Sequence, residues 1–131
     1  MPEQNQKRPL DIKLRKRSRT LELHYPDGEH YALPAEYLRV YSPSAEVRGH
    51  GSGQETLQTG KIEVGIDHIK PVGHYALQLM FDDGHDTGLY SWDYLYELCT
   101  QHSERWQDYL ARLHSAGASR DPKVQVLQFK P

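Results

Sequence analysis

Residues 81–95 read FDDGHDTGLYSWDYL and residues 25–38 read YPDGEHYALPAEYL, so nearly the same phrase occurs twice in one short chain. Sliding the chain by 56 positions aligns apolar residues, an Asp-Gly pair and a Tyr-Leu pair. The aligned residues are Leu21 with Leu77, Leu23 with Leu79, Tyr25 with Phe81, Asp27-Gly28 with Asp83-Gly84, Leu33 with Leu89 and, after one extra residue, Tyr37-Leu38 with Tyr94-Leu95. This duplication decides the fold that we expect.

Each copy has the pattern of a strand, a turn, a second strand and a helix. Apolar and polar residues alternate before each Asp-Gly, which is typical of a half-buried strand. Asp-Gly favours a tight hairpin, because glycine accepts the positive φ that primed turns require. Pro34 and Ser91 then stand where a helix begins, the first in its opening turn and the second as its N-cap. The sequence therefore predicts the α+β class, with small antiparallel sheets built from two strand-turn-strand-helix units.

The segments before and between the copies add two more strands. Ile12 and Leu14 alternate with Lys and Arg, which predicts an edge strand protected by charge. Residues 42–60 are rich in Gly, Ser and Thr and are predicted to be a loop. After this loop, apolar residues alternate again and predict a strand, with Ile62, Val64 and Ile66 on one face.

A C-terminal helix is predicted from Ser103, a suitable N-cap, to Gly117, a typical C-terminal glycine. Its apolar residues have helical spacing and form one face: Trp106, Tyr109, Leu110 and Leu113. We therefore expect a flexible basic N-terminus at 1–9, a single domain at 10–117 and a tail at 118–131. Val124 and Val126 alternate with polar residues, so this tail could instead contain a final strand.

Composition and charge limit the class of protein. The 131 residues have a net charge of −2, and the single cysteine, Cys99, excludes an internal disulfide or a cysteine-built metal site. No apolar run resembles a membrane span or a signal peptide, so we expect a cytoplasmic protein without membrane contact. Residues 1–20 hold seven of the sixteen basic residues. They could meet nucleic acid or an acidic partner, but no aromatic residues are interleaved, and we favour a charged sheet edge.

The histidine that follows the second Asp-Gly has two readings. His85 could bind a metal or move protons near neutral pH, and Asp82, Asp83 and Asp86 would favour its charged form. A hairpin turn is usually exposed, however, and we favour a solvated turn. Elsewhere, His102-Ser103-Glu104 is too weak for an oxygenase site. Cys99 has apolar helical neighbours and is expected to be buried and unreactive.

Two long phrases, LPAEYLRVYSPSAEVRGHG at 33–51 and PVGHYALQLMFDDGHDTGLYSWDYLYEL at 71–98, resemble the gamma-butyrobetaine hydroxylase-like N-terminal domain family. The resemblance implies an α+β module that, in carnitine-pathway oxygenases, precedes the catalytic domain and holds zinc with three cysteines and one histidine. Similar domains are fused to some iron–sulfur carrier ATPases. Neither catalytic partner is present in this sequence.

The resemblance places the zinc ligands at four positions of this chain. The three cysteine positions hold Ser42, Ser44 and Val47, and the histidine position holds His85. Serine is a poor zinc ligand beside thiolate and valine is none, so only His85 is retained. We expect the structural zinc to be absent and no cofactor to be bound.

The function that we expect is a non-enzymatic binding or adaptor module with a protein partner, which the fusions link to iron–sulfur cluster handling. The predicted binding residues lie on loops held by a rigid scaffold: Arg39, Ser42, Ser44, His50, Asp83 and His85. The same residues could simply tie the two units together. The alternative function is iron or zinc binding by His85 with His50 or His74. The oligomeric state stays open.

Overall fold

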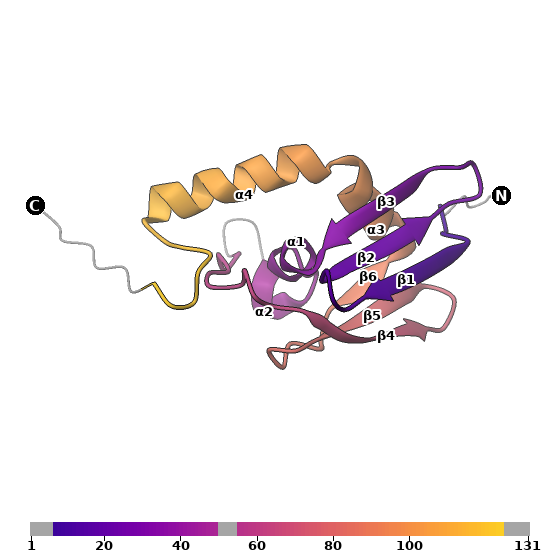
Figure 1. Cartoon of the computed structure of the whole chain (residues 1–131), viewed down its shortest axis with the longest axis horizontal. Coiled ribbons are helices and arrows are strands. Elements are labelled where there is room, and N and C mark those ends of the chain that lie inside the picture. The colour runs from indigo at the N-terminus through magenta and orange to yellow at the C-terminus, as the bar shows by residue number, and fades with distance from the viewer. Residues whose placement is uncertain (1–6, 50–54, 125–131) are drawn as a thin grey trace, which may run out of the picture.

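The structure, a computed structural model of the chain, describes residues 7–49 and 55–124. The first unit is a three-stranded antiparallel sheet followed by a helix (Figure 1). It comprises β1 (Asp11–Arg15), β2 (Thr20–His24), β3 (His30–Pro34) and α1 (Ala35–Val40). The second unit repeats this order with β4 (Ile66–Val72), β5 (Ala76–Phe81), β6 (Leu89–Ser91) and α3 (Trp92–Thr100). The α+β class and the duplicated unit are confirmed, and the third strand of each unit is the strand predicted ahead of that copy.

The strand register shows how the two copies correspond. Leu21 of β2 lies opposite Leu33 of β3, and its counterpart Leu77 of β5 lies opposite Tyr90 of β6. Tyr90 is fully buried, whereas Leu89 is 49% exposed. The predicted alignment of Leu33 with Leu89 is therefore wrong by one position: Leu33 corresponds to Tyr90, because the extra residue lies in the second turn, before β6 begins.

Both Asp-Gly pairs form turns of the same shape. Gly28 has φ +88° and Gly84 has φ +89°, the left-handed region that favours glycine. The Gly28 amide donates to the Tyr25 carbonyl at 3.1 Å, and the Gly84 amide donates to the Phe81 carbonyl at 3.2 Å. The two hairpins are confirmed, but Pro26-Asp27 and Asp82-Asp83 occupy the centres of the turns and each glycine follows them, so the Asp-Gly pairs do not form primed turns.

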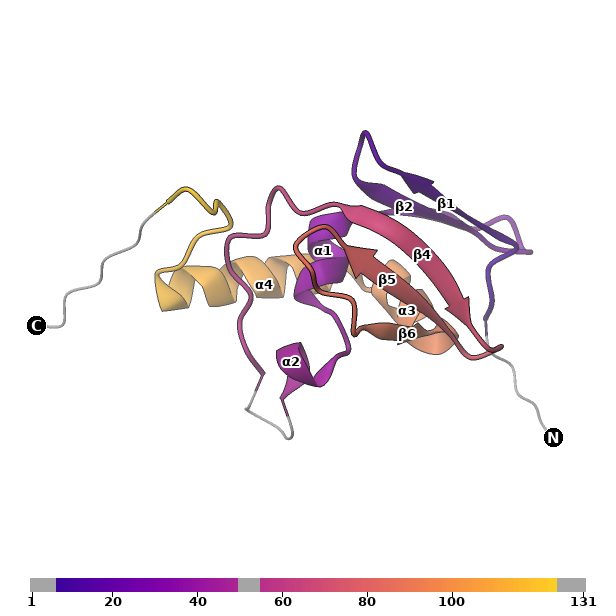
Figure 2. The same ribbon diagram turned by 90° about the horizontal axis from the view of Figure 1, so that it is seen from below.

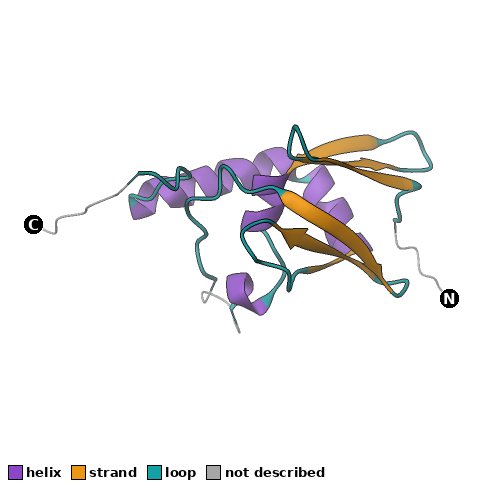
Figure 3. Cartoon of the chain, turned by 60° about the horizontal axis from the view of Figure 1, so that its bottom comes forward, coloured by secondary structure: helices purple, strands orange, loops and turns teal. Residues whose placement is uncertain are grey.

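The two sheets pack on one shared core. In Figures 2 and 3 the sheet of β1–β3 lies above that of β4–β6, with the helices packed beside them. Leu21 and Leu23 of β2 and Leu77 and Leu79 of β5 are at most 2% exposed and belong to one apolar cluster. The shared cluster buries apolar residues of both sheets, so it stabilises the two units together.

The order of strands is β1-β2-β3 in one sheet and β4-β5-β6 in the other, so among the described residues β1, β3, β4 and β6 are edge strands. Lys13 and Arg15 are exposed on β1, as the charge pattern predicted. Pro71 lies on β4, where the missing amide hydrogen of proline is tolerated because an edge strand leaves one side unpaired.

The long C-terminal helix, α4 (His102–Ala116), begins earlier than predicted. Its N-cap residue is Gln101, which makes no side-chain cap, and Ser103 lies inside the helix. The predicted cap at Ser103 is wrong, because α3 ends at Thr100 and the chain turns directly into α4. Gly117 ends α4 with φ +65°, as predicted.

Two middle segments also differ from the predictions. The predicted loop contains a short helix, α2 (Ala45–Arg48). The predicted strand at Ile62 starts only at Ile66, because the Ile62 amide donates to the Arg120 carbonyl instead of a strand partner. None of the helices within the described ranges is long and apolar enough to cross a membrane.

Candidate functional site

His85 follows the second Asp-Gly turn and is only 7% exposed, so the predicted solvated turn is wrong. Its Nε2 atom lies 2.8 Å from Ser42 Oγ and 3.4 Å from Ser44 Oγ, both just after α1. Its Nδ1 atom lies 3.1 Å from Glu46 Oε1 on α2. The imidazole therefore links the second hairpin to the segment that follows the first unit.

Burial lowers the pKa of His85 below its ordinary value, and the nearby Arg39 guanidinium lowers it further. Glu46 and Asp83 raise this pKa only in part. The expectation that neighbouring aspartates favour the charged ring is wrong, because the loss of water outweighs the carboxylates. In the neutral ring, Nδ1–H donates to Glu46 and Nε2 accepts from the Ser42 hydroxyl.

A charged network lies beside this histidine. Arg39 Nε donates to Asp83 Oδ2 at 2.9 Å, and Lys61 Nζ donates to the same oxygen at 3.0 Å. Burial opposes ionisation of Asp83, but hydrogen bonds from Lys61, the His85 amide and Arg39 together lower its pKa. Arg39 Nη1 also donates to Gln58 Oε1 at 3.0 Å. The network ties the end of α1 to the second turn and to the segment after residue 55.

The structure thus brings together five of the six residues predicted from the sequence: Arg39, Ser42, Ser44, Asp83 and His85. Four of them are at most 8% exposed, namely Arg39, Ser42, Ser44 and His85. His50 lies outside the described residues. The cluster is mainly an internal polar joint, with little surface of its own.

The donor set at this joint does not fit a zinc ion. Two hydroxyls, of Ser42 and Ser44, face Nε2 of His85, and Val47 is buried without any donor atom. Zinc sites need thiolate, imidazole or carboxylate ligands, and these positions supply only the imidazole. No group of three or more His, Cys, Asp or Glu that could hold a metal occurs among residues 7–49 and 55–124.

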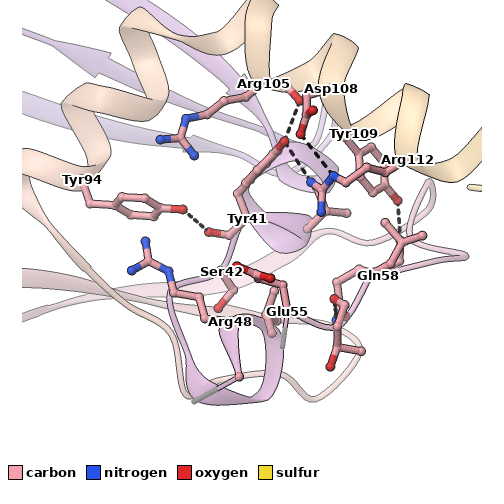
Figure 4. A pocket seen from close by; sticks show the side chains of 15 residues that line it. Tyr41, Ser42, Arg48, Glu55, Gln58, Tyr94, Arg105, Asp108, Tyr109 and Arg112 are labelled. Atoms are coloured by element: carbon pink, nitrogen blue, oxygen red, sulfur yellow. Dashed lines mark hydrogen bonds and ion pairs between the residues drawn. The ribbon is translucent and has the colours of Figure 1, made fainter. Parts of the chain in front are cut away.

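A cavity of about 660 Å³ opens on the other side of Ser42, between α2 and α4 (Figure 4). Its wall contains three arginines, three tyrosines and two carboxylates, which come from both repeats and from α4. The lining includes the side chains of Tyr41, Ser42, Arg48, Glu55, Thr56, Tyr94, Arg105, Asp108, Tyr109 and Arg112.

Five of these side chains form an alternating stack that we call the Arg–Tyr ladder. It consists of Arg48, Tyr94, Arg105, Tyr41 and Arg112, in that order. The guanidinium carbons of Arg48 and Arg105 lie 4.5 and 5.7 Å from the centre of the Tyr94 ring. Those of Arg105 and Arg112 lie 5.4 and 5.6 Å from the centre of the Tyr41 ring. Cation–π attraction holds guanidiniums in such positions.

Hydrogen bonds fix the two rings of the ladder. The Tyr94 hydroxyl donates to the Tyr41 carbonyl at 2.6 Å, and the Tyr41 hydroxyl donates to the Arg105 carbonyl at 2.7 Å (Figure 4). Arg112 Nη2 donates to the Tyr41 hydroxyl at 3.1 Å. These hydrogen bonds orient both tyrosine rings beside the arginines.

The three arginines differ in their counter-charges. Arg105 pairs with Glu97, and Arg112 Nε lies 3.1 Å from Asp108 Oδ2. No carboxylate within the described part of the chain lies within ion-pair distance of Arg48. This arginine is exposed on α2 and ends the ladder at the Tyr94 ring.

Reasoning from the sequence did not find the ladder. Its members come from four separate segments, and no local motif joins them. Arg105 and Arg112 are seven residues apart and share a helix face, which was the one available signal. That spacing alone does not distinguish a functional face from an ordinary solvated one.

Several solved structures resemble this chain in both fold and sequence. One, determined by NMR in solution, is 54% identical, covers 95% of this chain and 98% of its own length, and has a TM-score of 0.81. A second NMR structure is 46% identical, covers 100% and 98%, and has a TM-score of 0.77. A crystal structure of a protein of unknown function, of the DUF971 family from Acidithiobacillus ferrooxidans, is 41% identical, covers 70% and 91%, and has a TM-score of 0.59.

No curated protein matches this chain. The family model described as gamma-butyrobetaine hydroxylase-like, N-terminal, matches residues 12–96, which include both hairpins, α1 and most of α3. The chain belongs to the gamma-butyrobetaine hydroxylase-like, N-terminal family.

Proposed function

We propose that the chain is a cytoplasmic, non-enzymatic binding module that docks a protein partner at the cavity between α2 and α4. The observation that carries this proposal is the Arg–Tyr ladder in the wall of a cavity of about 660 Å³. Tyrosine and arginine dominate the energetic centres of protein interfaces, because they combine large apolar area with hydrogen-bond donors. The family resemblance favours a partner in iron–sulfur cluster handling.

The five residues predicted from the sequence that meet in the structure lie next to the cavity wall. Ser42 lines the cavity and also bonds His85, so it joins the two sites. Arg39 and Asp83 hold the end of α1 against the second turn. Ser44 precedes α2, the helix that carries Arg48. In this proposal all five residues position the wall, because Ser42 is itself only 1% exposed.

One arrangement could be mistaken for a hydrolase site. Ser42 Oγ, the His85 ring and Glu46 follow one another at 2.8 and 3.1 Å, in the order of a Ser-His-acid triad. Ser42 is only 1% exposed, however, and a Cβ placed on Gly88 would lie 2.6 Å from its Oγ atom. A nucleophile needs room for a carbonyl carbon about 3 Å away. A fluorophosphonate probe should leave Ser42 unlabelled.

The metal-binding alternative gains no support from the described residues. Both ring nitrogens of His85 already have partners, and His74 is exposed in the turn after β4. The structure therefore favours docking over metal binding.

Photo-crosslinking tests the proposed function. Thr56 is exposed and lines the cavity, whereas Tyr75 is 72% exposed and lies outside the cavity lining. A photo-reactive benzoylphenylalanine at each position, in cells that naturally express the chain, should give a discrete protein adduct from position 56 and none from position 75. The purified partner should then shift the NMR signals of Tyr94 and Arg48. Equal adducts from both positions, or none from position 56, would overturn the proposal.

A further inference from the structure

We infer that the cavity recognises a single carboxylate of its partner, an acidic side chain bound by Arg48 within a mostly neutral segment. This inference rests on the proposed function and names the chemistry of the ligand. It starts from the geometry of the Arg–Tyr ladder.

The ladder prepares Arg48 for a planar anion. The Arg48 guanidinium lies over the Tyr94 ring, with its carbon 4.5 Å from the ring centre. In Figure 4 the guanidiniums of Arg48 and Arg105 lie on opposite sides of this ring. The N–H groups of a guanidinium form a planar fork that matches the two oxygens of a carboxylate. Because the stack restricts the side chain beforehand, less conformational entropy is lost on binding.

The balance of charge favours a monoanion. The cavity lining holds Arg48, Arg105 and Arg112 with Glu55 and Asp108, and Glu97 pairs with Arg105 from outside the lining, so these charges balance and a ligand of low charge is favoured. Arg105 and Arg112 already have the partners Glu97 and Asp108. A carboxylate would give Arg48 an ion-pair partner. A phosphate dianion would bring one more negative charge and would be repelled by the two lining carboxylates.

The rest of the surface selects against a strongly acidic partner. Of the eighteen acidic residues, sixteen lie after residue 20, together with nine basic residues. This body repels a polyacidic chain at long range. One carboxylate among neutral neighbours avoids this repulsion. The rings of Tyr41, Tyr94 and Tyr109 then offer apolar area to the residues that flank it.

An NMR titration of the full chain tests the inference. The probes are the blocked tripeptide Ala-Glu-Ala, its uncharged match Ala-Gln-Ala, and inorganic phosphate. The variants are Arg48→Gln and, as a control, Arg17→Gln, which removes the same charge from an exposed position in the turn between β1 and β2. The glutamate peptide should shift the Arg48 side-chain and Tyr94 ring signals in the wild type and in Arg17→Gln. Affinity should fall at least about tenfold in Arg48→Gln, since a hydrogen-bonded charge is lost.

Three results would overturn the inference: equal shifts with the glutamine peptide, stronger shifts with phosphate, or equal affinity in the two variants. None of them affects the crosslinking test, which asks only whether a partner protein meets the cavity. An adduct from position 56 together with failure of the glutamate peptide would leave the docking function in place and reject the carboxylate. Failure of the crosslink would reject the docking function itself.

Discussion

Ser42 is the most closely surrounded polar residue of the joint between the two units. It is 1% exposed, its Oγ atom lies 2.8 Å from His85 Nε2, and it accepts from the Ser44 amide at 3.3 Å. Gly88 leaves no space on the remaining side, because a Cβ there would lie 2.6 Å from the same oxygen. Glycine is needed at position 88 for this close approach, without any unusual φ.

Replacing Gly88 by alanine should therefore destabilise the fold. We expect a loss of about 1–3 kcal/mol in the free energy of unfolding, the usual cost of overpacking. The variant Ser42→Ala removes the oxygen that the new methyl would strike. Urea unfolding of both single variants and of the double variant should give a double-variant loss clearly smaller than the sum. Strict additivity would show that the two positions do not meet.

The lowered pKa of His85 sets the direction of a pH effect. Its folded-state pKa lies below the ordinary value of 6.5, so the unfolded chain binds the proton first as pH falls. The stability that the neutral ring contributes is present above pH 6.5 and is lost as pH falls toward the folded-state pKa. Unfolding free energy measured between pH 8 and pH 5 should decrease toward the acid side.

The variant His85→Asn should show a shallower slope, although burial also lowers the pKa of His102, which keeps part of the effect. His74→Gln, at an exposed position outside the joint, is the control and should keep the wild-type slope. Identical slopes in the wild type and in His85→Asn would contradict this assignment.

Which residues meet at the joint was predictable, but their environment was not. The sequence predicted that Arg39, Ser42 and His85 lie together, because they stand in the two phrases that resemble the family and His85 directly follows the second Asp-Gly pair. The burial of His85 depends on how the second hairpin packs against the segment after α1, a contact between residues 43 apart in sequence. Local patterns carry no information on such contacts, so the charge state was misjudged.

At the scale of elements, Ser91 and Ser103 were both predicted to be helix N-caps, and only one of them is. Ser91 caps α3, with its Oγ atom accepting from the Tyr94 amide at 3.1 Å. Ser103 lies inside α4 without a capping role. Ser91→Ala should cost about 1 kcal/mol of unfolding free energy, the usual value of an N-cap. Ser103→Ala should stay within about 0.5 kcal/mol of the wild type. Thermal or urea unfolding distinguishes the two, and equal losses would refute the structural assignment.

Elements with a strong period were found from the sequence, and elements without one were missed. The strands β2 and β5 alternate cleanly, and each precedes an Asp-Gly turn, so both were placed correctly. Helix α2 has four residues, too few for a helical period to be visible. The segment from Ile62 to Val64 alternates like a strand, yet its backbone bonds to the C-terminal segment. Long-range pairing decided these cases.

At the scale of the whole molecule, the shared apolar cluster predicts that both units unfold together. Leu79 of β5 is fully buried in this cluster, whereas Leu89 at the start of β6 is 49% exposed. Leu79→Ala should lower the unfolding free energy by about 2–5 kcal/mol, and Leu89→Ala should change it by no more than about 0.5 kcal/mol. Amide hydrogen exchange should show that Leu79→Ala weakens protection in β2 as much as in β5. Unchanged protection in β2 would mean that the units are independent.

The exposed edges of the two sheets determine how the molecule behaves in a crowded solution. A free edge is a template on which other chains can add strands, and this is how amyloid-like fibres grow. Lys13 and Arg15 place charge along β1, and Pro71 interrupts the donors of β4. Charge on β1 and proline on β4 therefore disfavour the addition of a foreign strand at these two edges.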